Sequence, residues 1–303
     1  GGRAVAALAA AGLVPCTLEL GGKNPAYVHA DAALAPTARK LVQGRCLNAG
    51  QVCVAPDWVL VHADAREALV AELARAAREF YGEDAQASPD FGRIVNLKEF
   101  DRLQSMLDQM HSGKVITIGG RPDRAALFFP PTLVVDPEPA ARVAREELFG
   151  PVLVLRTVRG PDEAIDLIRA RPKPLSAYVF AQNKSVQLQF ETRVSSGNMV
   201  FNETCFQTLH PNLNFGGVGQ SGTGAYRVSK SFETFSHMKA VMSRPIWFDP
   251  FLRYPPFAPS HLRAVRGVYD GTLAAAARLG ERTARAAAAL VAVLLVWQYW
   301  PWR

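Results

Sequence analysis

The stretch Leu18-Glu19-Leu20-Gly21-Gly22-Lys23-Asn24-Pro25 sets one carboxylate in an apolar run that ends in two glycines. Residues 15–20 alternate as a strand does, and the Ala-rich run 2–12 before them favours a helix. A helix, a strand and a glycine turn in succession are typical of α/β folds, in which strand ends carry chemistry. Because a buried carboxylate is costly, we expect Glu19, at such an end, to have a chemical use.

A second segment with chemical character is Asn48-Ala49-Gly50-Gln51-Val52-Cys53-Val54-Ala55-Pro56. A thiol becomes a strong nucleophile when part of it is thiolate or when a base removes its proton, and a carboxylate can do this through a water. Other interpretations remain open from the residues alone. Cys53 could be a small buried hydrophobe, and Glu19 could be a strand-end carboxylate paired with Lys23.

Helical and strand-like patterns alternate along most of the chain that follows. This alternation predicts an α/β fold with a mostly parallel sheet covered on both faces. The loop 47–55 would expose Cys53, and the Pro-rich stretch 245–259 indicates a connector. The expected helices are 34–46, 65–80, 97–110, 162–170 and 185–192, and the expected strands are 58–62, 115–118, 132–135, 152–157, 176–180 and 196–201.

The composition narrows the classes of function. The chain has 303 residues, of which 49% are hydrophobic and 20% charged, and its formal net charge is +7. The basic residues are scattered, which argues against nucleic-acid binding. The 4 cysteines and 6 histidines show no metal-ligand spacing. We therefore expect reduced thiols, no disulfide framework and no metal site.

Five motifs together resemble the aldehyde dehydrogenase superfamily, in this order along the chain. After the Glu19 and Cys53 segments come Glu146-Glu147-Leu148-Phe149-Gly150-Pro151, then Ser196-Gly197-Asn198-Met199-Val200-Phe201-Asn202, then Asn214-Phe215-Gly216-Gly217-Val218-Gly219-Gln220-Ser221-Gly222. The segment 226–237 and Leu252-Arg253-Tyr254-Pro255-Pro256 resemble the class-three and fatty aldehyde dehydrogenase branch. Often the family has a histidine where this chain has Arg227, a departure that concerns substrate preference more than chemistry.

The resemblance implies a role for each site residue. Cys53 would attack the aldehyde carbon to give a thiohemiacetal, hydride would leave to the nicotinamide of NAD or NADP, and Glu19 would activate the water that hydrolyses the thioester. Glu147 would hold the nicotinamide ribose and Phe149 would pack near the ring, although this acidic run could also be an exposed turn. The glycines that match cofactor-binding positions are Gly2 and Gly21.

The resemblance also implies a domain organisation. Residues 1–20 would be the remnant of a Rossmann-type dinucleotide-binding domain, 21–225 the catalytic domain, 226–260 an oligomerisation arm and connector, and 261–303 a C-terminal tail. Family members carry most of the dinucleotide-binding domain, and an asparagine that helps to hold the oxyanion, before the first of these motifs. We therefore expect a fragment of a longer enzyme, with little turnover alone, from a protein that forms homodimers.

The tail contains the apolar run 286–300, and aromatic residues continue to 302. A membrane span needs about 20 apolar residues, so this run is short, although its aromatic end is typical of a membrane interface. We expect the segment 286–302 to attach the protein to an internal membrane with the catalytic part facing the cytosol. The alternative is an apolar helix packed on protein.

The expected activity is oxidation of a medium- or long-chain aliphatic aldehyde to its acid. Two alternatives remain. One is a non-catalytic truncated paralogue that serves membrane attachment or subunit pairing. The other is a cofactor-independent esterase that forms a thioester on Cys53.

Overall fold

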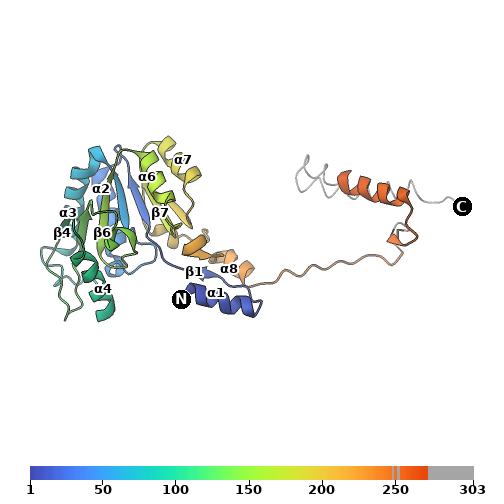
Figure 1. Ribbon diagram of the computed structural model, residues 1–303, viewed down its shortest axis with the longest axis horizontal. Helices are drawn as coiled ribbons and strands as arrows, with labels where there is room; N and C mark the ends of the chain where they lie inside the picture. The colour runs from blue at the N-terminus through green and yellow to red at the C-terminus, as the bar shows by residue number, and fades with distance from the viewer. Residues whose placement is uncertain (248, 251–252, 272–303) are drawn as a thin grey trace. The chain divides into compact units, whose positions relative to one another are not determined.

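The computed structural model describes residues 1–247, 249–250 and 253–271, and it divides the chain into two units, Gly1–His237 and Met238–Arg303 (Figure 1). In the second unit, residues 259–271 are helical. Among the described residues, no helix combines the length and apolar character that crossing a membrane requires. The apolar segment 286–302 lies outside the described residues.

The first unit is built around a seven-stranded sheet with the order β4-β5-β6-β3-β2-β7-β8. Only the edge strand β4 runs antiparallel to its neighbour, so the expected mostly parallel sheet is confirmed. The strands are β2 (Pro25–Val28), β3 (Trp58–His62), β4 (Lys114–Thr117), β5 (Thr132–Val135), β6 (Val152–Val158), β7 (Ser176–Phe180) and β8 (Asn198–Phe201).

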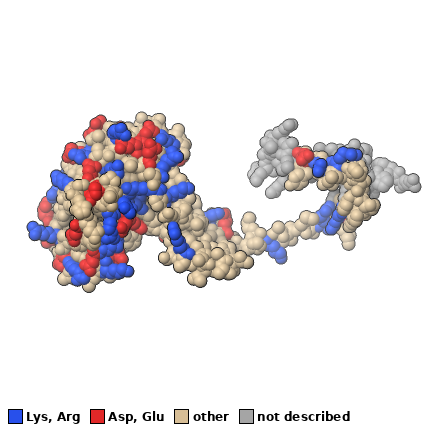
Figure 2. Space-filling view, viewed as in Figure 1, with Lys and Arg blue, Asp and Glu red and all other residues tan. Residues whose placement is uncertain are grey.

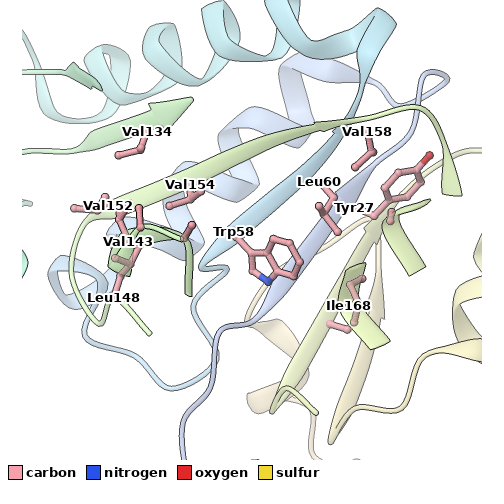
Figure 3. Packing of buried hydrophobic residues seen from close by; sticks show 14 of the residues in the cluster. Tyr27, Trp58, Leu60, Val134, Val143, Leu148, Val152, Val154, Val158 and Ile168 are labelled. Carbon is pink, nitrogen blue, oxygen red and sulfur yellow. The ribbon is translucent and has the colours of Figure 1, made fainter. Parts of the chain in front are cut away.

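Helices cover both faces of this sheet (Figure 1). Helices α2 (Leu34–Cys46) and α3 (Arg66–Tyr81) share one apolar cluster, while α4 (Leu97–Asp108), α6 (Pro161–Arg169) and α7 (Lys184–Arg193) contribute to another. The two clusters meet at the strands because successive side chains point to opposite faces. Tyr27, Trp58 and Leu60 pack toward Ile168 of α6 in Figure 3.

Strand β2 was not expected from the sequence, although it lies in the middle of the sheet between β3 and β7. It has four residues, all buried, and it begins at Pro25. A proline is tolerated at the first position of a strand because no ladder hydrogen bond is lost there. A buried run of this length carries no period that distinguishes strand from helix, which is why the pattern did not reveal it.

The strand expected over 15–20 is shorter than predicted and does not belong to the main sheet. Strand β1 (Leu18–Glu19) pairs antiparallel with β9 (Gly222–Thr223), which places Glu19 opposite Gly222. Gly222 has a φ of +144°, and a Cβ there would overlap the carbonyl oxygen of Leu18. The glycine-rich segment 214–224 therefore folds back onto the Glu19 segment.

Three further helices complete the first unit. Helix α1 (Gly2–Ala11) has no buried residue, α5 (Arg142–Arg145) precedes the Glu147 segment, and α8 (Val228–Thr234) follows the glycine-rich segment. Lys and Arg occur together with Asp and Glu across the face of the first unit shown in Figure 2. The charges are thus interspersed on this face.

The motif segments gather at the amino-terminal ends of the parallel strands. Lys23 precedes β2, Cys53 precedes β3, Glu147 precedes β6 and Lys173 precedes β7. Because these strands are parallel, the loops before them meet at one edge of the sheet. Glu19 ends a strand, as expected, but that strand is β1 of the two-stranded sheet and not a strand of the main sheet. Ligands of open α/β sheets usually bind at the carboxyl ends of the strands, whereas the candidate site lies at the other edge.

Candidate active site

The loop that carries Cys53 has an unusual backbone. Asn48, Ala49 and Gly50 have positive φ values of 52°, 52° and 77°. A left-handed conformation costs a residue with a Cβ about 1–2 kcal/mol, so the surrounding structure must hold this turn in place. A Cβ on Gly50 would overlap the carbonyl of Gly150, which shows how closely this loop approaches the segment after Glu147.

Side-chain hydrogen bonds tie the loop to neighbouring elements. Arg45 Nη2 donates to the Gly50 carbonyl at 2.6 Å, and Gln51 Nε2 donates to the Arg93 carbonyl at 2.9 Å. Asn24 Nδ2 donates to the Cys53 carbonyl at 2.8 Å, so the residue that follows Lys23 fixes the backbone of Cys53 directly. The loop conformation is therefore determined by its partners in the fold.

The sulfur of Cys53 lies beside Glu19. Burial raises the pKa of the Cys53 thiol to about 12, and the negative charge of Glu19 and a hydrogen bond to its carboxylate add to that rise. The thiol is therefore protonated at neutral pH and needs a base. Oε1 of Glu19 is buried and has no hydrogen-bond partner in the part of the chain that the structure describes. The structure brings together the two residues that the sequence singled out as catalytic.

The alternative in which Lys23 pairs with Glu19 is wrong. Lys23 forms its ion pair with Asp57, and its Nζ also donates to the Glu146 carbonyl at 2.8 Å. Burial lowers the pKa of the Lys23 ammonium, and the charge of Asp57 opposes this effect. Among the described residues, Lys23 therefore forms no ion pair with Glu19.

Asp57 is a buried residue of the site that the sequence analysis missed. It is 1% exposed, and besides Lys23 it receives Arg45 Nη1 at 3.4 Å and the backbone N–H of Leu148 at 2.9 Å. These contacts join the Lys23 segment, the Cys53 loop and the Glu147 segment. One sequence feature could have identified Asp57. It is an acidic residue directly before a buried strand, where an unpaired charge would be costly.

Glu147 lies directly over the glycine turn. A Cβ on Gly21 would overlap the carboxylate of Glu147, so only glycine leaves room for it there. Burial raises the pKa of the Glu147 carboxyl, and the backbone N–H of Gly22 that donates to it opposes this only in part. The structure thus brings together Gly21 and Glu147, two of the predicted cofactor-binding residues.

The other two predicted cofactor-binding residues lie in different surroundings. Phe149 is 38% exposed and has a positive φ of 49°. Gly2 begins α1, where a Cβ would lie 2.7 Å from a methyl group of Leu20. Gly2 therefore packs against the Glu19 segment but does not line the pocket described next, and its part in cofactor binding stays a prediction.

A pocket of about 520 Å³ opens beside the glycine turn. Its lining combines one carboxylate, that of Glu147, with four basic residues and two polar side chains. A dinucleotide carries ribose hydroxyls and a doubly anionic pyrophosphate, and these groups fit a carboxylate surrounded by cations. The residues that line it are Leu20, Gly21, Gly22, Lys23, Arg145, Glu147, Ala170, Arg171, Pro172, Lys173, Gln220 and Ser221.

Cys53 packs against an apolar cluster. Its buried members come from the nucleophile loop, the start of β7, the segment after β8 and the glycine-rich segment, and partly buried members complete the wall. Such a wall suits the hydrocarbon part of a substrate. The buried members are Val54, Leu175, Cys205 and Phe215, and the partly buried ones are Val52, Cys53 and Tyr226.

Comparison with known proteins identifies the family of this chain. The model of the aldehyde dehydrogenase family matches residues 1–241. Aldehyde dehydrogenase family 3 member H1 of Arabidopsis thaliana is 40% identical over 273 residues, which is 90% of this chain and 56% of that protein. The dimeric NADP-preferring aldehyde dehydrogenase of Canis lupus familiaris is 41% identical over 257 residues, which is 84% of this chain and 56% of that protein.

A solved structure agrees with these relatives. The substrate-bound state of Staphylococcus aureus AldH superposes with a TM-score of 0.83 at 36% identity, and it covers 88% of this chain and 58% of that one. The chain therefore spans about half the length of the curated relatives it matches. The resemblance to the class-three branch and the expected fold are both confirmed.

Proposed function

This chain belongs to the aldehyde dehydrogenase family, and we propose that the whole protein oxidises an aldehyde to a carboxylic acid with NAD or NADP. One observation carries the proposal. The Cys53 thiol lies beside the Glu19 carboxylate, which has a buried oxygen without a partner among the described residues, and the turn that follows Glu19 holds Glu147 at a pocket. A nucleophile, a base and a ribose-binding carboxylate thus converge at one edge of the sheet.

In the first step Glu19 takes the thiol proton while the sulfur of Cys53 bonds to the aldehyde carbon, which gives a thiohemiacetal on Cys53. Because the pKa of the thiol is about 12, the thiolate is rare at neutral pH, and proton removal must accompany the attack. The bound dinucleotide would supply the acceptor for the hydride of the aldehyde carbon. Glu147 and Gly21 would hold its ribose, as their contact supports.

The second step frees the acid from the thioester on Cys53. After Glu19 has released the thiol proton to solvent, it takes a proton from a water while the water oxygen bonds to the acyl carbon. The carbon–sulfur bond then breaks, and Glu19 returns the proton to the departing sulfur, which restores the Cys53 thiol and the Glu19 carboxylate. The buried, unpartnered Oε1 of Glu19 is an acceptor for that water. A single carboxylate would therefore serve both steps in turn.

The proposed substrate is a medium- or long-chain aliphatic aldehyde. The apolar wall of Val52, Val54 and Phe215 around Cys53 supports a hydrocarbon chain on this side of the site. The measurement is kcat/KM for neutral n-alkanals of increasing length with the complete natural protein. We expect a rise with each added methylene group, about threefold or fourfold where a methylene group is fully buried. A flat series would contradict the aliphatic preference.

The test of the activity uses the complete natural protein, since the residues described here span about half of a typical relative. We expect NAD(P)H formation with an alkanal, and a loss of at least about a thousandfold in Cys53→Ser. Cys16→Ser is the matched control, because Cys16 is another free, partly exposed cysteine. Full turnover in Cys53→Ser would contradict the proposal. The 303-residue chain alone should show little turnover.

Membrane attachment and dimer formation are further parts of the proposal. The composition of the segment 286–302 supports attachment to an internal membrane with the catalytic part on the cytosolic side, and the canine relative is named as dimeric. Flotation with liposomes should recover the complete protein and lose it when 286–302 is deleted. Equal flotation of both forms would contradict attachment, and a monomer in sedimentation analysis would contradict the dimer.

A further inference from the structure

We propose that Arg227 makes this site select aldehydes that carry a second, anionic group, a carboxylate or a phosphate. The inference deepens the proposed function, on which it rests, because it names a substrate class for the same Cys53. The substrate would place its carbonyl at the sulfur, its hydrocarbon part against the apolar wall and its anion at the guanidinium.

A continuous series of contacts leads from Arg227 to the nucleophile. The guanidinium carbon of Arg227 lies 5.1 Å from the centre of the Phe215 ring. Phe215 is buried and belongs to the same apolar cluster as Cys53, and its ring meets that of Tyr226 edge-on at 5.9 Å. The cation therefore stands at the outer side of the wall against which a substrate chain would lie.

The backbone around Arg227 is fixed in an unusual conformation. Arg227 has a φ of +81°, and its N–H donates to Ser231 Oγ at 2.6 Å. The preceding residue, Tyr226, exchanges two backbone hydrogen bonds with Phe215, at 2.9 and 2.8 Å. A positive φ costs an arginine about 1–3 kcal/mol, so these contacts hold a strained residue whose side chain is aimed at Phe215.

The charge of Arg227 is not neutralised by an acid. Within the part of the chain that the structure describes, no carboxylate forms an ion pair with its guanidinium, and the nearby Glu233 pairs with Lys230 at 3.1 Å. Its charge reaches the site, because the pKa of Tyr226 is raised by burial and by Glu19 while Arg227 opposes the rise. The Tyr226 hydroxyl thus senses both the proposed base and the cation, with which it also shares a hydrogen bond.

A carboxylate or phosphate on the substrate would form an ion pair with the Arg227 guanidinium. Arginine binds such groups with a planar pair of N–H donors, and a partly buried, charge-assisted contact discriminates strongly against a neutral analogue. The apolar surroundings of Phe215 weaken the competition from water for the guanidinium. We expect a preference of about tenfold or more for the anionic aldehyde over a neutral one of equal length.

The test needs no cofactor. Purified protein is treated separately with iodoacetate and with iodoacetamide at one pH, and the rate of Cys53 alkylation is read by mass spectrometry of its peptide. The ratio of the two rates cancels the thiol pKa and the accessibility of the sulfur, so it reports the charge near Cys53. In Arg227→Gln we expect the iodoacetate-to-iodoacetamide ratio to fall about fivefold or more, and in Arg227→Lys to be largely kept.

The matched control is Arg124→Gln, which removes the same charge from an exposed ion pair with Asp101. Its ratio should equal that of the natural protein. An unchanged ratio in Arg227→Gln would overturn the proposal, even if the enzyme oxidises neutral alkanals normally. Conversely, a lowered ratio in the complete natural protein, together with no NAD(P)H formation from any alkanal, would support the cation and contradict the proposed function.

In the active complete protein the same variants give a second measurement. We expect Arg227→Gln to lower kcat/KM for an ω-carboxylate aldehyde about tenfold and to leave that for the neutral aldehyde of equal length within about twofold. Equal losses for both aldehydes would show a structural role for Arg227 and overturn the selection.

Discussion

The interior of the seven-stranded sheet and its amino-terminal edge differ in almost every physical respect. In the interior, Ala26, Val59 and Leu60 are completely buried and apolar. At the edge, the side chains of Lys23 and Asp57 are charged although they are almost completely buried. Ala49 there has a left-handed backbone conformation. The apolar interior therefore provides the stability that allows the edge to hold buried charges and a strained backbone at the proposed site.

The largest expected effect is a loss of catalytic activity when the proposed base at the edge of the sheet is replaced. Glu19→Gln should lower turnover by about 10²–10⁴-fold, because it removes the proposed base. The same change should lower the pKa of Cys53, since the charge of Glu19 and its hydrogen bond raise it. Alkylation of Cys53 by iodoacetamide at pH 8 should therefore become faster while turnover falls. Slower alkylation would contradict the contact between the two residues.

The second prediction compares stability at the two places. Asp57→Ala should destabilise the first unit by about 3–5 kcal/mol, because it leaves Lys23 and Arg45 buried without their anion. Leu60→Ala in the interior should cost about 2–5 kcal/mol through the cavity that it leaves. Urea unfolding measures both.

The two variants should differ in chemistry as well. Asp57→Ala should slow Cys53 alkylation and turnover per folded molecule, because Asp57 joins three segments of the site, whereas Leu60→Ala should leave both unchanged. If the variants behave alike in the folded state, the edge network has no positioning role.

A smaller effect is expected at the glycine turn. Gly21→Ala should weaken cofactor binding by about tenfold, because the new Cβ would displace the Glu147 carboxylate from its place over the turn. Isothermal titration of the complete protein with NAD and NADP measures it. Gly160→Ala is the control, because a Cβ there meets no atom within 4 Å. Unchanged affinity in Gly21→Ala would separate Glu147 from the cofactor.

The smallest effect concerns the strained loop. Ala49→Gly should change the free energy of unfolding by less than about 1 kcal/mol, because relief of a positive φ offsets the entropy that glycine adds to the unfolded chain. Gly50→Ala is the sharp contrast, since its Cβ would overlap the Gly150 carbonyl at a φ of +77°, and it should cost more than about 2 kcal/mol. Equal effects of the two changes would show that the loop relaxes freely.

Elements with a long, clear period were predictable from the sequence. Helix α2 spans Leu34–Cys46, as expected, because its apolar residues recur with a helical period. Strand β3 spans Trp58–His62, as expected, although it has no period, because its apolar run follows the turn signal at Pro56. Strand β2 was missed because a four-residue buried run has no period. The predicted length of β1 was too long, because its pairing with β9, in which Glu19 lies opposite Gly222, joins segments far apart in the chain.

The candidate site divides in the same way. Cys53, Glu19, Gly21 and Glu147 were identified from local residue types and a family resemblance, and the structure places them in two contacting pairs. Asp57 was not identified as a site residue, and Arg227 was noted only as a departure from the family pattern, because the role of a charged side chain becomes visible only through the partners that it has or lacks.

By itself, the sequence determined the α/β class, the family and the residue types at the nucleophile and base, because periodicity, turn residues and motifs are local properties of the chain. Only the tertiary structure decided which edge of the sheet carries the candidate site, that Lys23 pairs with Asp57 and leaves Glu19 to Cys53, and that Arg227 lies over Phe215 with no ion-pair partner among the described residues. These are outcomes of packing between distant segments, and burial gives each charge its energy only after that packing exists.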